Sequence, residues 1–347
     1  MGMQKTLPDI AAPLMAWFEA NKRALPWRDG REPYHVWVSE IMLQQTRIEA
    51  VKRYYARFMR ELPDVASLSA VSEDRLLKLW EGLGYYSRAR NLKKAAEIIM
   101  EAYDGNFPNT YAELLKLPGV GEYTAGAIAS ICFDEKVTAV DGNVLRVISR
   151  VTGNRENVLL PETKKAVTAQ LQAVLPDRPG IFNEALMELG ELVCLPNGTP
   201  LCEQCPIRAV CVACREGLTD VLPVRVKRQK RRRENKTVLV LVAPDGRVAI
   251  EKRVGKGLLS GMYQLPNVDG FLTKEALQGV LREWQLVPLE QCFAKEAKHV
   301  FTHIDWYMQG WRVTVREKGG RFLWVSPQEL TDTYALPTAF RPFADWF

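Results

Sequence analysis

Apolar residues recur at helical spacing through most of the first 192 residues. The pattern begins at Leu14 and Phe18 and continues over residues 36–58. It returns over roughly 87–103, 122–133, 142–152, 162–175 and 181–192. Helix-start signals fall between these segments: Ser72 is followed by two carboxylates, and Thr110 stands three residues before Glu113 as in a capping box. We therefore expect an all-α region that ends near residue 214.

The pattern changes after residue 236. The run Val238-Leu239-Val240-Leu241-Val242 is followed by the turn Pro244-Asp245-Gly246 and by a second short apolar run at 247–250, which predicts a β-hairpin. Residues 306–315 and 321–325 are also strand-like, and 273–284 resembles a short helix. The chain should be multidomain, with an all-α region over 1–214, a basic linker over 215–236 and an α+β domain over 237–347.

Length and composition agree with this division. The chain has 347 residues, of which 47% are hydrophobic and 25% are charged. Such values exclude a disordered or collagen-like chain and permit two globular domains. No run of 18 apolar residues and no secretory signal pattern occurs in the sequence. We expect a soluble, cytoplasmic protein.

Positive charge is concentrated in the expected linker. Residues 215–236 contain nine Lys and Arg against three acidic residues, whereas the whole chain has 47 basic and 41 acidic side chains. A basic run of this kind can be a solvated connector. It can equally follow a phosphate backbone, because neutralising phosphates releases counterions. The run by itself does not decide between the two.

Four of the seven cysteines are closely spaced. They form the pattern Cys194-x7-Cys202-x2-Cys205-x5-Cys211. Disulfides are rare in intracellular proteins, whereas four thiolates can hold tetrahedral zinc or a [4Fe–4S] cluster. The spacing indicates a metal centre without choosing between them. Cys214 is an additional nearby thiol, and Cys132 and Cys292 are interpreted as small core residues.

A glycine-rich turn joins two of the expected helices. In Leu117-Pro118-Gly119-Val120-Gly121, the glycines permit a tight turn, and the following helix start offers free N–H groups to a phosphate. Twenty residues after Gly121, Asp141 opens another helix. Asp141 can be a simple helix cap. The combination of hairpin, thiols and basic run argues against Asp141 being a helix cap alone.

Together these segments resemble the helix-hairpin-helix glycosylases of base excision repair, and within them the adenine DNA glycosylase (MutY) family. The resemblance covers nearly the whole chain. Besides the hairpin and the cysteine pattern it rests on 25–28 (LPWR), 38–46 (VSEIMLQQT), 82–92 (GLGYYSRARNL), 140–143 (VDGN) and 301–303 (FTH). It implies an all-α helix-hairpin-helix region with a [4Fe–4S] cluster on Cys194, Cys202, Cys205 and Cys211. The first cysteine interval is one residue longer than the family's usual six.

The resemblance also implies catalytic roles. Glu40 would protonate adenine at N7, and Asp141 would stabilise the oxocarbenium-like sugar, which follows the logic of glycoside hydrolysis. Asn143 would orient Asp141 or the water, and Tyr123 would support the cation region. Glu40 stands among Val38, Ile41, Met42 and Leu43, where burial would raise its pKa. The alternative is an exposed helix residue.

Other residues are implied to contact DNA. Trp27 and Arg28 would line the pocket for the flipped adenine, and Gln45 and Tyr85 would act as wedges in the base stack. We interpret Tyr86 as a packed anchor. The full set of expected DNA-binding residues is Gln45, Thr46, Leu83, Tyr85, Gly119, Val120 and Gly121.

The C-terminal domain resembles a Nudix fold. An active Nudix hydrolase needs a carboxylate-rich box, and residues 282–286 (REWQL) lack its metal ligands. The domain should therefore read a lesion and hydrolyse nothing. The resemblance implies that Phe301, Thr302 and His303 recognise 8-oxoguanine, with Thr302 where the family usually has serine. The alternative is an ordinary strand with Phe301 in the core.

Three functions remain open at this point. The first is a monofunctional glycosylase that acts, as a monomer, on double-stranded DNA with adenine opposite 8-oxoguanine or guanine. The second is an endonuclease III-type glycosylase and lyase, which needs an amine nucleophile. Tyr123 stands where that group has its lysine, and a phenol cannot form an imine. The third is a damage-binding protein without catalysis.

Overall fold

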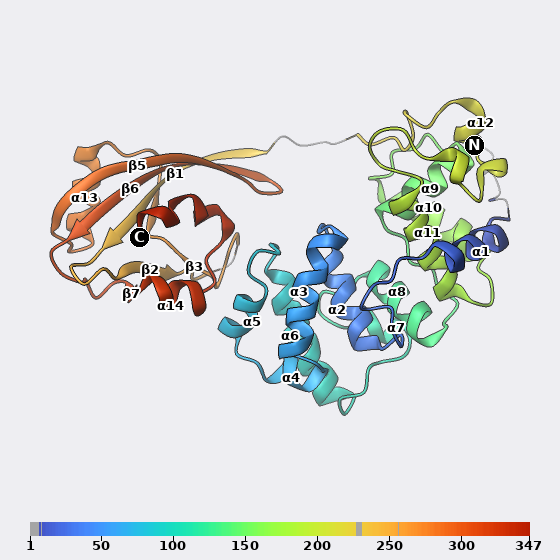
Figure 1. The fold of residues 1–347 in the computed structure, drawn as a ribbon, viewed down its shortest axis with the longest axis horizontal. Coiled ribbons are helices and arrows are strands. Elements are labelled where there is room, and N and C mark those ends of the chain that lie inside the picture. Colours follow the sequence, from blue (N-terminus) through green and yellow to red (C-terminus); the bar gives the residue numbers. More distant parts are fainter. Residues whose placement is uncertain (1–6, 8, 227–230, 256) are drawn as a thin grey trace. The chain divides into compact units, whose positions relative to one another are not determined.

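The helical periodicity of the first part of the chain produces a set of short, closely packed helices. The computed structural model describes residue 7 and residues 9–226, 231–255 and 257–347. These residues form two units, one from chain ranges 1–70 and 91–228 and the other from 71–90 and 229–347 (Figure 1). In the first unit the helices are α1 (Ala11–Asn21), α2 (Pro33–Leu43), α3 (Ile48–Glu61), α4 (Val65–Ala70), α7 (Tyr111–Leu114), α8 (Glu122–Phe133), α9 (Gly142–Thr152), α10 (Pro161–Gln172), α11 (Pro179–Leu192), η1 (Cys202–Gln204), η2 (Arg208–Val210) and α12 (Val212–Glu216). Helix α6 (Ser87–Ala102) begins in the second unit and continues into the first, and α5 (Glu73–Leu79) belongs to the second.

Most of the predicted helices are confirmed. Helices α8 and α9 have the predicted bounds, and α6, α10 and α11 differ from the prediction by one to three residues at an end. The apolar stretch over 36–58 is divided between α2 and α3, because the chain turns at Gln45, whose φ is 60°. Ser72 caps α5 by accepting the N–H of Arg75, and Thr110 caps α7 by accepting the N–H of Glu113. The helix-start signals in the sequence were therefore correct.

A long central helix organises the core of the first unit. Helix α11 is buried on almost every side and packs against α1, α8 and α9. Phe18, Val147, Phe182 and Leu186 lie in this core, and each is at most 1% exposed. Among the described residues no helix is both long and apolar enough to cross a membrane.

The second unit contains a mixed, seven-stranded sheet. Its main order is β3-β2-β1-β6-β5, with β4 added beside β1 and β7 beside β2. Strands β1 and β6 are parallel, whereas β1–β2 and β5–β6 are antiparallel. The elements are β1 (Arg232–Val242), β2 (Val248–Lys252), β3 (Tyr263–Gln264), β4 (Asn267–Asp269), α13 (Lys274–Glu283), β5 (Pro288–Val300), β6 (Ile304–Val315), β7 (Leu323–Val325), α14 (Pro327–Asp332) and η3 (Thr338–Trp346).

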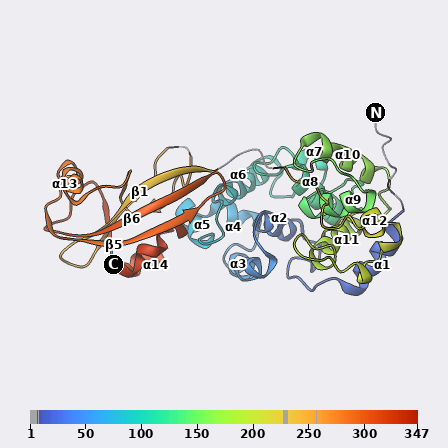
Figure 2. The same cartoon turned by 90° about the horizontal axis from the view of Figure 1, so that it is seen from above.

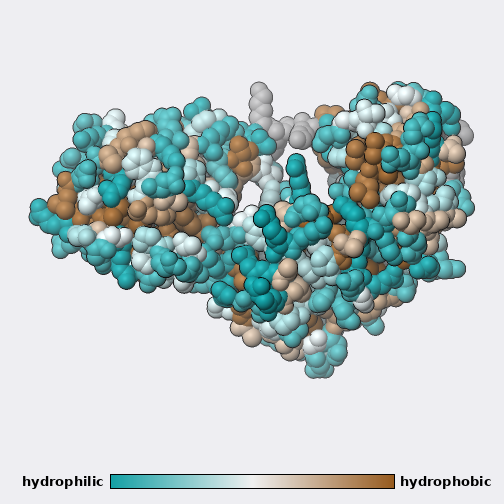
Figure 3. All heavy atoms as spheres, viewed as in Figure 1, coloured by the Kyte–Doolittle hydropathy of each residue, from teal (hydrophilic) through white to brown (hydrophobic). Residues whose placement is uncertain are grey.

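Successive side chains of β1 point to opposite faces of the sheet, and each face packs against a different set of helices. Val238 and Val240 face a core that includes Phe340 and Phe343 of η3. Leu239 faces the opposite side, in the core to which α13 contributes. Figures 1 and 2 show α13 and α14 on the two sides of the sheet. In Figure 3 the visible surface is mainly hydrophilic, with apolar residues in scattered groups.

The β-hairpin prediction is confirmed, because Val242 pairs with Val248 across the predicted turn. Two features differ from the sequence-based expectations. The predicted linker over 215–236 overlaps α12 at its start and β1 at its end, and its residues 227–230 lie outside the described residues. Strand β5, which the pattern analysis did not find, has exposed or half-buried residues throughout. Its edge position explains why it lacks a clear apolar alternation.

Candidate active site

Glu40 lies on α2 with its carboxyl buried in the first unit. The residue is 8% exposed, so the interpretation of Glu40 as an exposed helix residue is wrong. Tyr123, in the first turn of α8, donates its hydroxyl to Glu40 Oε2 at 2.6 Å, and the same hydroxyl is 3.1 Å from Met187 Sδ. Burial raises the pKa of Glu40 to about 7, and the negative charges of Asp141 and Glu184 act in the same direction against the Tyr123 hydrogen bond. The site therefore holds a carboxyl group that keeps a proton near neutral pH.

Asp141 stands at the start of α9. Its Oδ1 accepts the N–H of Val144 at 2.8 Å, and its Oδ2 accepts Asn143 Nδ2 at 2.9 Å. Burial raises the pKa of Asp141, while these hydrogen bonds oppose the rise. The carboxylate is thus a helix cap and, at the same time, a charge close enough to Glu40 to raise the pKa of Glu40.

Arg146 links the cysteine-rich loop, residues 194–214, to Asn143, which in turn donates to the Asp141 carboxylate. Its Nη2 donates to Asn143 Oδ1 and to the carbonyl of Gly190, both at 2.8 Å, and its Nε donates to the carbonyl of Cys194 at 2.8 Å. A Cβ atom on Gly190 would lie 2.7 Å from Asn143 Cβ. Only glycine at position 190 lets α11 approach α9 this closely. Asn143 is therefore packed against Gly190 and hydrogen-bonded to Arg146.

A second charged cluster, which sequence reasoning missed, lies on α11. Glu188 accepts Arg23 Nε and Nη2 at 2.8 Å and Arg28 Nη2 at 3.0 Å, and Glu184 accepts Arg28 Nε at 3.0 Å. Burial alone would raise the pKa of Glu188, but the hydrogen bonds from both arginines lower it to about 2. Burial raises the pKa of Glu184. The sequence signal was present, because Glu184 and Glu188 stand one turn apart in a helix that is mostly apolar.

We expect Glu188→Gln to destabilise the protein by roughly 3 kcal/mol, which is the lower end of the range for breaking a buried ion pair, since both arginines keep some contact with water. The side chain of Glu188 is 2% exposed, against 26% for Arg23 and 19% for Arg28. Urea denaturation midpoints measure the change. Glu19→Gln, which breaks an exposed pair with Lys22, is the control and should cost under about 1 kcal/mol. Equal losses in the two variants would contradict the assignment.

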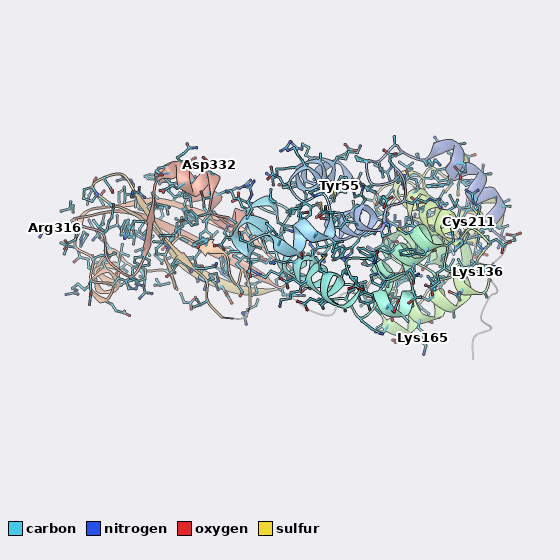
Figure 4. The ribbon with its side chains drawn as sticks, turned by 90° about the horizontal axis from the view of Figure 1, so that it is seen from below. Tyr55, Lys136, Lys165, Cys211, Arg316 and Asp332 are labelled. Atoms are coloured by element: carbon cyan, nitrogen blue, oxygen red, sulfur yellow. The ribbon has the colours of Figure 1, made fainter. Side chains whose placement is uncertain are left out.

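The two expected pocket residues have different surroundings. Trp27 is 5% exposed and packs edge to face against Tyr55 of α3, with ring centroids 5.2 Å apart; Tyr55 is labelled in Figure 4. Arg28 belongs to the Glu184 and Glu188 cluster. Arg28 also affects Glu40, because its positive charge lowers the pKa of that carboxyl group.

Both expected wedge residues have left-handed backbone conformations. Gln45 has φ 60° and Tyr85 has φ 48°, which non-glycine residues adopt rarely and which cluster at functional sites. Tyr85 is 44% exposed, whereas Tyr86 and Leu83 are buried. Tyr86 is thus a packed residue, as expected. Thr46 is half-buried, and its hydroxyl lies 3.5 Å from the carbonyl of Gln44.

The glycine-rich turn has the geometry of a hairpin between α7 and α8. Gly119 has φ +78°, and a Cβ atom there would lie 2.7 Å from the Asn91 Cβ atom. Gly121 precedes α8, and a Cβ atom there would meet nothing within 4 Å. Val120 is buried. The turn therefore leaves open space beside the free N–H groups at the start of α8, where an anion can be bound.

The cysteine-rich loop lines a pocket together with residues of α9 and α11. All four predicted ligands line it, and so does Cys214; Cys211 is labelled in Figure 4. Arg150 Nη1 donates to Cys194 Sγ at 3.3 Å. Within the described ranges, no three His, Cys, Asp or Glu side chains converge closely enough to hold a single metal ion.

The expected lesion-reading triplet forms the turn between β5 and β6. The N–H of Phe301 donates to the carbonyl of Ile304 at 2.8 Å, and the Phe301 ring packs against Trp306 with centroids 5.0 Å apart. Thr302 and His303 are exposed. The hydroxyls of Tyr85 and Thr302 share a hydrogen bond of 2.7 Å, so two expected DNA contacts meet within the second unit.

The chain is similar to known proteins over both of its domains. Residues 38–177 match the HhH-GPD superfamily of base excision DNA repair proteins, and residues 237–346 match the NUDIX domain family. The human adenine DNA glycosylase is 34% identical over 94% of this chain and 72% of its own length. The enzyme from Buchnera aphidicola subsp. Baizongia pistaciae is 31% identical, over 85% of this chain and 83% of its own length. The Arabidopsis thaliana enzyme is 36% identical over 84% of this chain, which spans 55% of that enzyme.

Solved structures give the same result for the helical part. A thermostable thymine-DNA glycosylase aligns with a TM-score of 0.54 and 28% identity, over 59% of this chain and 95% of its own. A trapped endonuclease III–DNA covalent intermediate aligns with a TM-score of 0.50 and 25% identity, over 59% of this chain and 93% of its own. These likenesses are to a DNA glycosylase and to endonuclease III, and the relatives that extend across both domains are adenine DNA glycosylases. The chain belongs to the adenine DNA glycosylase family.

Proposed function

We propose that this chain is a monofunctional DNA glycosylase that hydrolyses the N-glycosidic bond of adenine mispaired with 8-oxoguanine or guanine and leaves an abasic site. The observation that carries the proposal is the pairing of two unlike carboxyl groups in one buried site. Glu40 keeps a proton near neutral pH, and Asp141 is held by two hydrogen bonds at a helix start. Family membership supports adenine as the base.

The chemistry follows from the different surroundings of the two carboxyl groups. Adenine is a poor leaving group, so protonation of the base by Glu40 lowers the barrier. Tyr123 donates to Glu40 Oε2, which leaves Oε1 to carry and deliver the proton. As the bond breaks, positive charge develops on the sugar, and Asp141 stabilises it. Asn143 orients Asp141 through the 2.9 Å hydrogen bond.

Adenine must leave the duplex before Glu40 can reach it, at a cost of a few kcal/mol. Gln45 and the exposed Tyr85 are suited to fill or separate the stack, since their strained backbones hold them at turns. The hairpin at Gly119–Gly121 is suited to bind a phosphate. Trp27 and Arg28 would border the extruded base. The likeness to endonuclease III–DNA complexes supports DNA as the partner.

A single-turnover assay of base release tests the proposed function. Duplexes with adenine opposite 8-oxoguanine, guanine and thymine should give the fastest release for the first and the slowest for the last. Borohydride should trap no covalent complex, because Tyr123 occupies the position of the lyase lysine. Efficient trapping would instead favour a lyase, and binding of mispaired duplex without base release would favour a damage-binding protein.

We also propose that the cysteine-rich loop holds a [4Fe–4S] cluster on Cys194, Cys202, Cys205 and Cys211. The residues fit such a group, since all four thiols line one pocket and four thiolates are the usual ligands of an iron–sulfur cluster. A cluster would cross-link the loop in the folded state and so stabilise it. Cys214 lines the same pocket, so five thiols are available for the four ligand positions of a cluster. The one-residue extension of the first cysteine interval makes it necessary to test which four bind.

We expect purified protein to be brown, with broad absorbance near ~400 nm from thiolate-to-iron charge transfer. Cys214→Ser should retain all its iron, because the spacing of the other four thiols matches the family pattern most closely. Cys202→Ser is the matched comparison and should lose iron. Iron and sulfide analysis measures both. Loss of iron in Cys214→Ser would show that the longer interval has shifted ligation to Cys214, and colourless protein with stoichiometric zinc would overturn the cluster.

The preference for 8-oxoguanine should depend on the exposed donors of the β5–β6 turn. Discrimination by one or two hydrogen bonds is worth roughly 1–3 kcal/mol. Replacing Thr302 and His303 together by Ala should therefore lower the ratio of rates on adenine opposite 8-oxoguanine and opposite guanine by about five- to 150-fold. Single-turnover rates at subsaturating enzyme give this ratio, while the rate at saturation should fall less. A folded double variant with an unchanged ratio would assign the turn a structural role only.

A further inference from the structure

One end of the sheet carries a group of cations around a single aromatic ring. We call it the basic surface and define it by Arg231, Arg233, Lys298 and Tyr307. In the register of the sheet Arg233 stands opposite Asp305, and Lys298 stands opposite Tyr307. Directly paired residues project to the same side of a sheet, and so do residues two apart along a strand. The three strands β1, β6 and β5 thus contribute to one face.

Among the described residues, no helix packs over this end of the face. Helix α13 packs against the other end of the same face, where Leu239, Leu241 and Val313 form a core. On the reverse side Trp306 is 1% exposed in the core that includes η3. The side chains of Arg231 and Lys298 are 53% and 45% exposed. The basic surface is therefore accessible, and its cations are not required to cover a core.

The cations contact one aromatic ring and one carboxylate. The Arg233 guanidinium carbon is 4.0 Å from the centroid of the Tyr307 ring, and Lys298 Nζ is 4.8 Å from it. One carboxylate serves the group, since Asp305 is 3.0 Å from Lys298 and 3.9 Å from Arg231. Three cations against one acid leave an excess of positive charge. A planar guanidinium with free donors is suited to phosphate oxygens.

The neighbouring turn indicates which anion the surface meets. Arg232 N–H donates to the carbonyl of His303 at 2.9 Å, so the basic surface begins directly beside the turn over 301–303. If that turn reads a damaged base, as the proposed function holds, the strand carrying the base has a phosphate about every 3.4 Å of helix axis on either side. We propose that Arg231, Arg233 and Lys298 bind phosphodiester groups of the DNA strand that contains the damaged base. This inference rests on the proposed function. It means that Arg231 and Arg233, near the end of the basic run over residues 215–236, bind DNA.

The test is the salt dependence of DNA binding by the full chain. The probe is a duplex with 8-oxoguanine opposite a tetrahydrofuran abasic analogue, which offers no base to release. In the double variant Arg233→Gln/Lys298→Gln, the slope of log Kd against log salt should fall in magnitude by about 1.8, or about 0.9 for each phosphate that the protein no longer neutralises. Arg316→Gln is the matched control. Arg316 is exposed just beyond the far end of β6 (Figure 4), and its variant should keep the parent slope.

If the double variant has the same slope of log Kd against log salt as the parent protein, the inference is overturned, whether or not binding is weaker. Thermal melting verifies that the variants are folded, and Lys298→Gln alone, expected to change the slope by about 0.9, replaces the double variant if that fails to fold. Adenine release by the parent is measured separately. If the parent releases adenine and the variant keeps the parent's salt slope, phosphate binding by the basic surface is rejected and the proposed function stands. No release by the parent together with a reduced slope rejects the proposed function and keeps the surface.

Discussion

Glu40→Gln should lower the single-turnover rate of adenine release by about 10²–10⁴-fold, the range typical for loss of a general acid. Glutamine keeps the size of the side chain and can still accept the Tyr123 hydroxyl at the position of Oε2, so the fold of α2 should be preserved. What it removes is the proton that burial retains on Glu40, whose pKa is raised to about 7. Binding to the duplex should change little, because the buried carboxyl is not a phosphate contact.

The pH profile separates this role from a structural one. A raised pKa means that the protonated acid is present below about pH 7 and is lost as the pH rises through that value. The parent rate should therefore fall about tenfold for each pH unit well above 7, and the residual rate of Glu40→Gln should lack this dependence. Glu49→Gln, at an exposed side chain on α3, is the control. Release by Glu40→Gln within threefold of the parent would refute the assignment.

Much of the fold could be predicted because local patterns and caps agree with tertiary packing. Helices α8 and α9 have strong start signals at Gly121 and Asp141, and both were placed correctly. Strand β5 could not be found, since it is an edge strand whose residues are all exposed or half-buried and show no regular apolar alternation. The assignment of residues 71–90 to the second unit also has no local signal. It depends on contacts such as that of Lys252 with Asp74, 178 positions apart, which periodicity cannot reveal.

The candidate site was predictable where residue type limits the chemistry. A carboxylate within an apolar helix, at Glu40, and a carboxylate at a helix start, at Asp141, both stand out in a sequence. The partners of these groups do not. Arg146 reaches Asn143 along its own helix but also the carbonyls of Gly190 and Cys194, far along the chain. The raised pKa of Glu40 likewise depends on the Asp141 and Glu184 charges, which only the fold brings near.

Asp141→Asn should lower adenine release by about 10²–10³-fold, as loss of one preorganised electrostatic interaction typically does. The change removes the negative charge that opposes the developing sugar cation, yet it keeps a good helix cap, because Asn and Asp are about equal at that position. The hydrogen bond from the Val144 N–H to Oδ1 can remain. The hydrogen bond with Asn143 cannot, since two amide groups would face each other while Asn143 Oδ1 accepts Arg146. Its absence should cost about 1 kcal/mol of stability.

Two measurements decide whether Asp141 acts in the reaction or only as a cap. Thermal melting of Asp141→Asn should show a small loss, whereas single-turnover release at saturating enzyme should show the large one. Asp141→Ser is the matched control, because serine also caps helices well and removes the same charge without placing an amide beside Asn143. If the charge is what matters, both variants lose activity together although only Asp141→Asn carries the amide conflict. Activity retained in Asp141→Ser would mean that Asp141 serves the helix alone and that the sugar cation is stabilised by another group.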